Sequence, residues 1–283
     1  MDKLNKERFD GLMGSTRTPW TRIAGIERAW YSEEQERVLC VVVEDTTDGD
    51  FACIMLARDA VGRYRAVDLT KFYSSLQEAE DAVPSLLKEW AEKSPTAYVQ
   101  GDEPRQRMDF FTPRHPRERL NPSFISIVEC EELSPAKGII ESMMHYFEDP
   151  DGNFVEQFQS VAFNARIWEL YLFAVLAENR CWIDRTHPAP DYLFTDVFGE
   201  GFIEAVTVNP SGLGNDPVFP TDTAALDNFR ANFLPIKFAG PLFSKLTRKY
   251  WEQTFIGDRP VVLAVADFHQ GGATSKSQDS LLG

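Results

Sequence analysis

The most restrictive feature of this chain is the apolar run near its end, residues 260–268 (PVVLAVADF). Apolar and polar positions do not alternate in this run as they do in a half-buried strand. A continuous run of this kind is typical of a strand that is buried on both faces. We therefore expect a buried central strand here, in an α/β domain with a mixed sheet.

The elements in front of this strand follow a definite order of helix, three strands, helix and strand, or αβββαβ. Apolar spacing and turn signals place them as a helix at residues 154–179, strands at 181–184, 191–194 and 202–208, helices at 221–233 and 241–253, and the strand at 260–268. A polar tail, residues 271–283, follows the last strand. Because a central strand has neighbours on both sides, we expect more chain or a partner subunit, such as a second copy in a homo-oligomer, to complete the sheet.

The first half of the chain has the pattern of a β-meander followed by a helix. Apolar and β-branched runs at residues 37–44 and 51–58 flank an Asp-Gly pair, which is a strong hairpin signal. Residues 63–69 alternate well enough to form a third strand. Residues 74–93 have helical spacing, with Pro84 inside the pattern, so we expect a kink or a late start in this helix.

Residues 94–122 interrupt this regularity with five prolines. Five arginines also gather there: Arg105, Arg107, Arg114, Arg117 and Arg119. The stretch also contains methionine and phenylalanine side chains that can be buried in a core. We therefore interpret it as an ordered linker or loop. After a predicted helix at residues 134–147 comes a turn. We therefore divide the chain into an N-terminal recognition or regulatory region, residues 1–150, and a second domain, residues 151–283.

Charge and composition limit the partners of the chain. It has 29 basic against 44 acidic residues, for a net charge of −15. This charge argues against a generally basic nucleic-acid-binding surface and against electrostatic docking on an anionic membrane, and it leaves room for a local basic site. We find no run of about 18 apolar residues and no secretory signal. The four cysteines lack CxxC spacing, which argues against a disulfide framework or a zinc site and favours a cytoplasmic location.

Three acidic residues lie at positions that are not typical of solvent-exposed surface acids. Glu169 falls on the apolar stripe of its helix, and a buried carboxylate there needs a cation, a hydrogen-bond donor or a metal. An ion pair with Arg166, one turn back, or a rotation towards solvent would also satisfy it. Glu204 is flanked by apolar residues in its strand, and a hairpin would bring it towards Asp191, which follows Pro190 and opens the preceding strand.

With these acids in place, the order of elements resembles the PD-(D/E)XK, or restriction endonuclease-like, nuclease superfamily. The resemblance covers residues 156–268 and implies an αβββαβ core. It assigns Asp191 to the motif aspartate, Glu204 to the (D/E) position and Glu169 to the helix acid that many members add. It also implies that these three carboxylates bind Mg²⁺ or Mn²⁺, with the carbonyl of Ala205 as a further ligand.

The chain departs from the family pattern at the lysine. The family places it two residues after the (D/E) acid, where this chain has Val206. Some members move the lysine onto the following helix, and Lys245 is the candidate there, near the start of the helix predicted at residues 241–253. Arg248 and Lys249 lie on the same polar stripe, and they form either a solvated basic face or contacts to nucleic acid.

Our leading hypothesis is a metal-dependent endonuclease that hydrolyses DNA, with prokaryotic restriction or phage defence as the setting that the resemblance suggests. Asp191, Glu204 and Glu169 would hold the ion, and Lys245 would polarise the attacking water or stabilise the developing charge. The alternative is a non-catalytic interaction or nucleic-acid-binding protein on a degenerate nuclease fold, which Val206 and the acidity favour. An unrelated α/β domain with these acids at its surface is the third interpretation.

Overall fold

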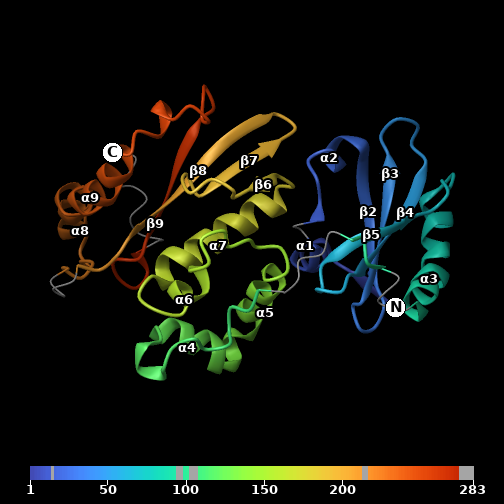
Figure 1. Ribbon diagram of the computed structural model, residues 1–283, viewed down its shortest axis with the longest axis horizontal. Helices are drawn as coiled ribbons and strands as arrows, with labels where there is room; N and C mark the ends of the chain where they lie inside the picture. The colour runs from blue at the N-terminus through green and yellow to red at the C-terminus, as the bar shows by residue number, and fades with distance from the viewer. Residues whose placement is uncertain (14–15, 94–97, 102–107, 212–215, 274–283) are drawn as a thin grey trace.

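The computed structural model describes residues 1–13, 16–93, 98–101, 108–211 and 216–273. It is a mixed α/β structure with a five-stranded antiparallel sheet and a four-stranded mixed sheet. The two sheets lie at opposite ends of the molecule, with helices between them (Figure 1). Within the described residues, no helix is long and apolar enough to cross a membrane.

The five strands of the N-terminal sheet are hydrogen-bonded in chain order. They are β1 (Asp2–Leu4), β2 (Gly25–Ser32), β3 (Val38–Asp45), β4 (Phe51–Arg58) and β5 (Tyr64–Leu69). The three predicted strands are confirmed as β3 to β5, but the prediction of a three-stranded meander is wrong, because β1 and β2 extend the sheet. The first half of β2 is charged and partly exposed, and a bulge between Glu27 and Ala29 interrupts its register. These features hide the strand from pattern analysis.

Helices cover both faces of this sheet. Helix α3 (Leu76–Glu92) lies on one face and buries Ala79, Val83 and Leu87 against β3 and β4. Ser75 caps the helix, since its side chain accepts a hydrogen bond from the amide of Glu78. Helix α1 (Lys6–Met13) packs on the other face, and α2 (Thr21–Ala24) precedes β2.

Residues 108–150 pack against the second half of the chain. The described part of the predicted loop contains only the short 3-10 turn η3 (Arg117–Arg119), and helix α4 (Pro122–Glu129), which was not predicted, begins at the last residue of that loop. After the 3-10 turn η4 (Glu131–Leu133), helix α5 (Ser134–Met143) begins at the predicted residue. One aromatic core joins residues from both sides of residue 150: Phe110, Phe111, Phe124, Phe147, Phe154, Phe158, Phe163 and Phe173.

The C-terminal sheet contains the strand order β6-β7-β8-β9. Its strands are β6 (Trp182–Asp184), β7 (Tyr192–Asp196), β8 (Gly199–Val208) and β9 (Val261–Asp267). The first three strands are antiparallel to one another, and β9 runs parallel to β8. The four predicted strands are therefore confirmed. The expectation that the last one is central is wrong for the described residues, where β9 is hydrogen-bonded to β8 alone and forms an edge.

Helices lie on both faces of this sheet (Figure 1). Helices α6 (Phe154–Phe158) and α7 (Phe163–Glu178) cover the face that presents Ile203 and Ala205. Helices α8 (Thr223–Asn232) and α9 (Leu234–Leu246) pack near Val208 on the other face, and the 3-10 turn η5 (Tyr250–Glu252) follows. The chain between β8 and β9 thus returns over the face opposite α7.

Two helix predictions need correction. The single helix predicted at residues 154–179 is broken into α6 and α7. The helix predicted to start at Pro241 begins at Leu234 instead, contains Pro241 in its interior and ends at Leu246. Lys245 therefore lies in the last turn of α9 rather than near its start. Arg248 and Lys249 come after the helix, and Lys249 has a left-handed backbone, with φ of 48°.

Polar contacts join the two halves of the molecule. The amide of Tyr64 donates to the hydroxyl of Tyr146 at 2.6 Å. A ring nitrogen of His145 lies 2.8 Å from the carbonyl oxygen of Val61. These contacts tie the loop and start of β5 to the segment that follows α5, so the N-terminal sheet is anchored to the aromatic core.

Candidate functional site

The candidate site lies where the C-terminal sheet has a gap. Strand β7 pairs with β8 only as far as Tyr192 and Ile203, whereas β8 continues to Val208 with β9 on its other side. Asp191 stands at the edge of this gap, and its Oδ2 accepts a hydrogen bond from the amide of Ala205 at 2.7 Å. Because the N–H and C=O of a strand residue point in the same direction, the carbonyl of Ala205 faces the gap as well.

A cavity of about 460 Å³ occupies the gap and reaches both faces of the sheet. Its walls come from α6 and α7, from the start of β7, from β8 and from α9. The lining residues are Gln157, Ala165, Arg166, Glu169, Asp191, Ala205, Val206, Thr207, Pro241, Ser244 and Lys245. Four of the residues predicted from sequence therefore meet at this cavity or border it: Asp191, Glu169 and Lys245 line it, and Glu204 lies beside it in β8.

Glu204 is buried on the face of the sheet that α9 covers. The residue is 1% exposed, as expected for the face that it shares with the buried Phe202 and Val206. Its Oε1 forms an ion pair with Nζ of Lys245 and lies 3.7 Å from Nη1 of Arg248. Its Oε2 is buried and has no hydrogen-bond partner in the part of the chain that the structure describes.

Glu169 lies on the opposite face, on α7, and is also buried. Its Oε1 accepts from Nη1 of Arg166 at 2.6 Å, and its Oε2 accepts from Nη2 of Arg185 at 3.2 Å. The expected ion pair with Arg166 is therefore present. The pKa of Glu169 is raised to about 7, because burial and, after it, the negative charge of Asp191 outweigh the opposing charges of the two arginines.

The negative charge of Asp191 interacts unfavourably with both buried acids, Glu169 and Glu204. Burial raises the pKa of Asp191, and the negative charge of Glu204 adds to this effect. The hydrogen bond from the Ala205 amide and the positive charges of Lys245 and Arg185 act in the opposite direction. A cation near Asp191 and Glu204 would relieve this repulsion.

The residues fit a divalent ion only in part. Within the described residues, no group of three His, Cys, Asp or Glu side chains is placed to hold a metal. Both oxygens of Glu169 accept from arginines, so they are occupied by ion pairs. Asp191 and Glu204 remain, and the unpartnered Oε2 of Glu204 suits a hard cation. Mg²⁺ is commonly held by one or two carboxylates, with waters and substrate phosphates as the other ligands.

The other predicted basic residues are more exposed. About half of the side chain of Arg248 is exposed, and Lys249 pairs with Glu252 at 2.8 Å. Arg105 and Arg107 lie outside the described residues, while Arg117 pairs with Glu129 on the surface. Val206 is buried on the α9 face of β8. Because its side chain is apolar, it cannot supply the positive charge of the lysine in the family pattern.

Sequence reasoning missed two residues of the site. Gln157 holds the guanidinium of Arg166 by hydrogen bonds to its Oε1. Arg185 follows β6 and reaches Glu169 from the loop that leads to β7. The signal for Arg185 was weak, because a single arginine in a loop has no periodicity, although the buried Glu169 did require a partner.

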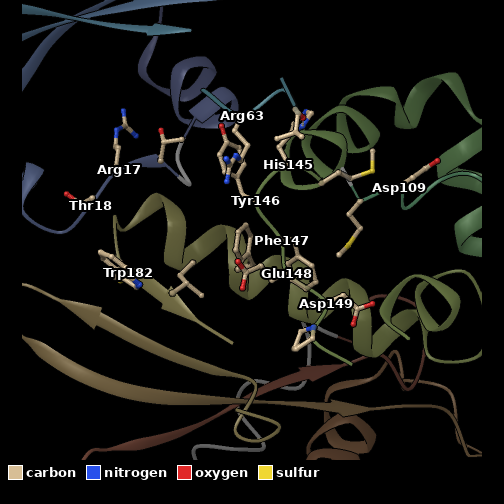
Figure 2. A pocket seen from close by; sticks show the side chains of 18 of the residues that line it. Arg17, Thr18, Arg63, Asp109, His145, Tyr146, Phe147, Glu148, Asp149 and Trp182 are labelled. Carbon is tan, nitrogen blue, oxygen red and sulfur yellow. Dashed lines mark hydrogen bonds between the residues drawn. The ribbon is translucent and has the colours of Figure 1, made fainter. Parts of the chain in front are cut away.

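A second, larger cavity of about 730 Å³ lies between the two halves of the molecule (Figure 2). Trp182 and Tyr146 are among its lining residues. Two of its three arginines, Arg17 and Arg63, are held by carboxylates of the N-terminal half, at 2.7 Å from Glu27 and 3.0 Å from Asp59. The charges of these two are thus balanced internally, and the acids of the candidate site are not among the lining residues.

Comparisons with protein-family models, with curated protein sequences and with solved structures found no match for this chain.

Proposed function

We propose that the C-terminal half of this protein is a magnesium-dependent nuclease of restriction endonuclease-like fold that hydrolyses DNA phosphodiester bonds. The observation that carries the proposal is the ion pair between Lys245 and Glu204, beside Asp191 at the cavity. Lys245 comes from α9, the second helix after the acid strand, and it supplies the cation that the strand lacks because Val206 occupies the lysine position of the family pattern. The order α7, β6, β7, β8, α9, β9, with β9 parallel to β8, also supports this fold.

The residues divide the chemistry of phosphodiester hydrolysis between them. Asp191 and Glu204 would hold Mg²⁺ or Mn²⁺, and the carbonyl of Ala205 faces the same gap. When bound, such an ion supplies positive charge to the phosphate and makes a water more acidic. Lys245 lines the cavity, so its ammonium can orient the attacking water or stabilise negative charge in the transition state. Asp191 is oriented by the amide of Ala205.

The test is cleavage of supercoiled and linear DNA in Mg²⁺ or Mn²⁺. We expect Asp191→Asn and Lys245→Met each to lower the rate by about 10²-fold to 10³-fold, as is usual when one electrostatic group is removed from a catalytic site. Lys93→Met is the matched control, because Lys93 lies at the end of α3 and pairs with the exposed Glu89. It should retain the full rate.

The structure also motivates a second candidate function. Glu204 is paired with Lys245 and nearly inaccessible to solvent, and the strand has Val206 in place of the lysine. Both features suit a nuclease-like domain that binds nucleic acid without cutting it. This function predicts DNA binding with no cleavage in either metal and no metal binding by calorimetry. Cleavage that survives Asp191→Asn would contradict our assignment of the site.

A further inference from the structure

Two arginines hold Glu169, and their surroundings differ. Arg185 is packed among aromatic rings, 4.1 Å from the ring centroid of Phe147 and 5.0 Å from that of Tyr192. Its Nη1 also donates to the carbonyl of Glu148 at 2.7 Å. Arg166 also lies over an aromatic ring, 5.2 Å from the ring centroid of Phe154, but unlike Arg185 it lines the cavity at the candidate site. Only one of the two cations is therefore available to a molecule in the cavity.

Arg166 has hydrogen-bonding capacity to spare. A guanidinium carries five N–H donors. Within the described residues, three of them are used: Nε and Nη2 donate to Gln157, and Nη1 donates to Glu169. These contacts fix the guanidinium plane at the cavity wall and leave two donors. A fixed, partly used guanidinium is a suitable partner for the oxygens of a phosphate.

The opposite wall of the cavity supplies a second cation and a hydroxyl. Lys245 and Ser244 come from α9, on the other face of the sheet, and Asp191 lies in the gap between the faces. A phosphodiester in the cavity would thus contact Arg166 on one side and Lys245 on the other. The cavity volume of about 460 Å³ lies within the range of roughly 300–1,000 Å³ that is typical of ligand pockets, so it can take a nucleotide-sized part of a strand.

We infer that Arg166 is a substrate-binding residue that donates to a phosphate oxygen of the nucleic acid strand in the cavity. The nuclease function proposed above supplies the identity of the substrate, and the geometry supplies the role of the arginine. Gln157 and Glu169 position the guanidinium. The cavity wall contains two cationic side chains, Arg166 and Lys245, and two acidic ones, Glu169 and Asp191. Since these charges are equal in number, the subsite selects a phosphate through directed hydrogen bonds rather than through net charge.

The experiment compares Arg166→Gln, Arg166→Lys and Arg37→Gln in full-length protein. Binding of a fluorescent duplex DNA is measured by anisotropy in metal-free buffer, at several salt concentrations, and KM and kcat are measured in Mg²⁺. Arg166→Gln should weaken DNA binding about 10-fold and raise KM by a similar factor, with a small change in kcat. It should also reduce the slope of log K against log salt by about 0.9, the value for one phosphate contact.

The matched control separates a phosphate contact from the loss of any positive charge. Arg37→Gln removes an exposed arginine that pairs with Glu33 in the N-terminal half, so it should leave the affinity and the salt slope unchanged. Arg166→Lys should restore part of the affinity. The inference is overturned if both glutamine variants change binding equally, if Arg166→Gln changes neither affinity nor slope, or if the wild-type protein does not bind DNA. Binding that depends on Arg166 without any cleavage by the wild-type protein would refute the nuclease proposal alone.

Discussion

Replacing Lys245 by methionine should destabilise the C-terminal sheet, because it removes the closest cation from a buried carboxylate. The Glu204 side chain is 2% exposed and that of Lys245 is 23% exposed. Removing one partner of a buried ion pair costs about 3–5 kcal/mol. Arg248 remains nearby, at 3.7 Å, and Lys245 is only partly buried. We therefore expect a loss at the lower end, about 3 kcal/mol, since methionine preserves most of the packing of the aliphatic stem.

The assay is native-state hydrogen exchange of the amides in β8 and β9, read by mass spectrometry in metal-free buffer. A loss of about 3 kcal/mol corresponds to exchange about 10²-fold faster wherever it proceeds through opening of this sheet. The double variant Glu204→Gln/Lys245→Met should recover most of the lost stability, because the neutral side-chain amide of glutamine leaves no unpaired negative charge buried at position 204. The reasoning is refuted if Lys245→Met changes the exchange rates by less than twofold, or if the double variant is no more stable than the single one.

Two further predictions concern Glu169 and Tyr146. The pKa of Glu169 is raised, mainly by burial, from an ordinary 4.5 to about 7, so the folded state holds this proton more tightly than the unfolded state. The free energy of unfolding should therefore decline by about 3 kcal/mol as pH rises from 4.5 to 7. In urea unfolding without metal, Glu169→Gln should remove that part of the pH dependence, and an unchanged slope would contradict the explanation. Tyr146→Phe should cost about 1–3 kcal/mol in urea unfolding, because the amide of Tyr64 loses its acceptor. The exposed Tyr171→Phe is its control, and an equal cost for both would contradict the assignment.

Much of the fold was predictable because its strands have strong local signals. The apolar runs of β3, β4, β8 and β9 are local, and the structure confirms them as strands. Strand β2 was not predictable in this way, since its pairing with β1 and β3 compensates for a charged, bulged sequence. Pro241 was interpreted as the first residue of a helix, whereas tertiary packing of Leu234 and Phe238 extends α9 in front of it.

The candidate site was predictable to the extent that its acids interrupt apolar patterns. Glu169 and Glu204 stood out for that reason, and both are buried. The sequence does not say on which face of the sheet each one lies, because that depends on the packing of α7 and α9. The pair of Glu169 with Arg166 is local and was expected, whereas its second partner, Arg185, became evident only from the tertiary structure, in which Arg185 approaches from a loop.

The central claim is that Asp191 and Glu204 hold a divalent ion next to Lys245. The most direct test is the anomalous scattering of crystals soaked in millimolar Mn²⁺. Our account predicts a single strong peak at about 2.1 Å from a carboxylate oxygen of Asp191 and from Oε2 of Glu204, with Lys245 still paired to Oε1 of Glu204. The absence of a peak between Asp191 and Glu204 would contradict it.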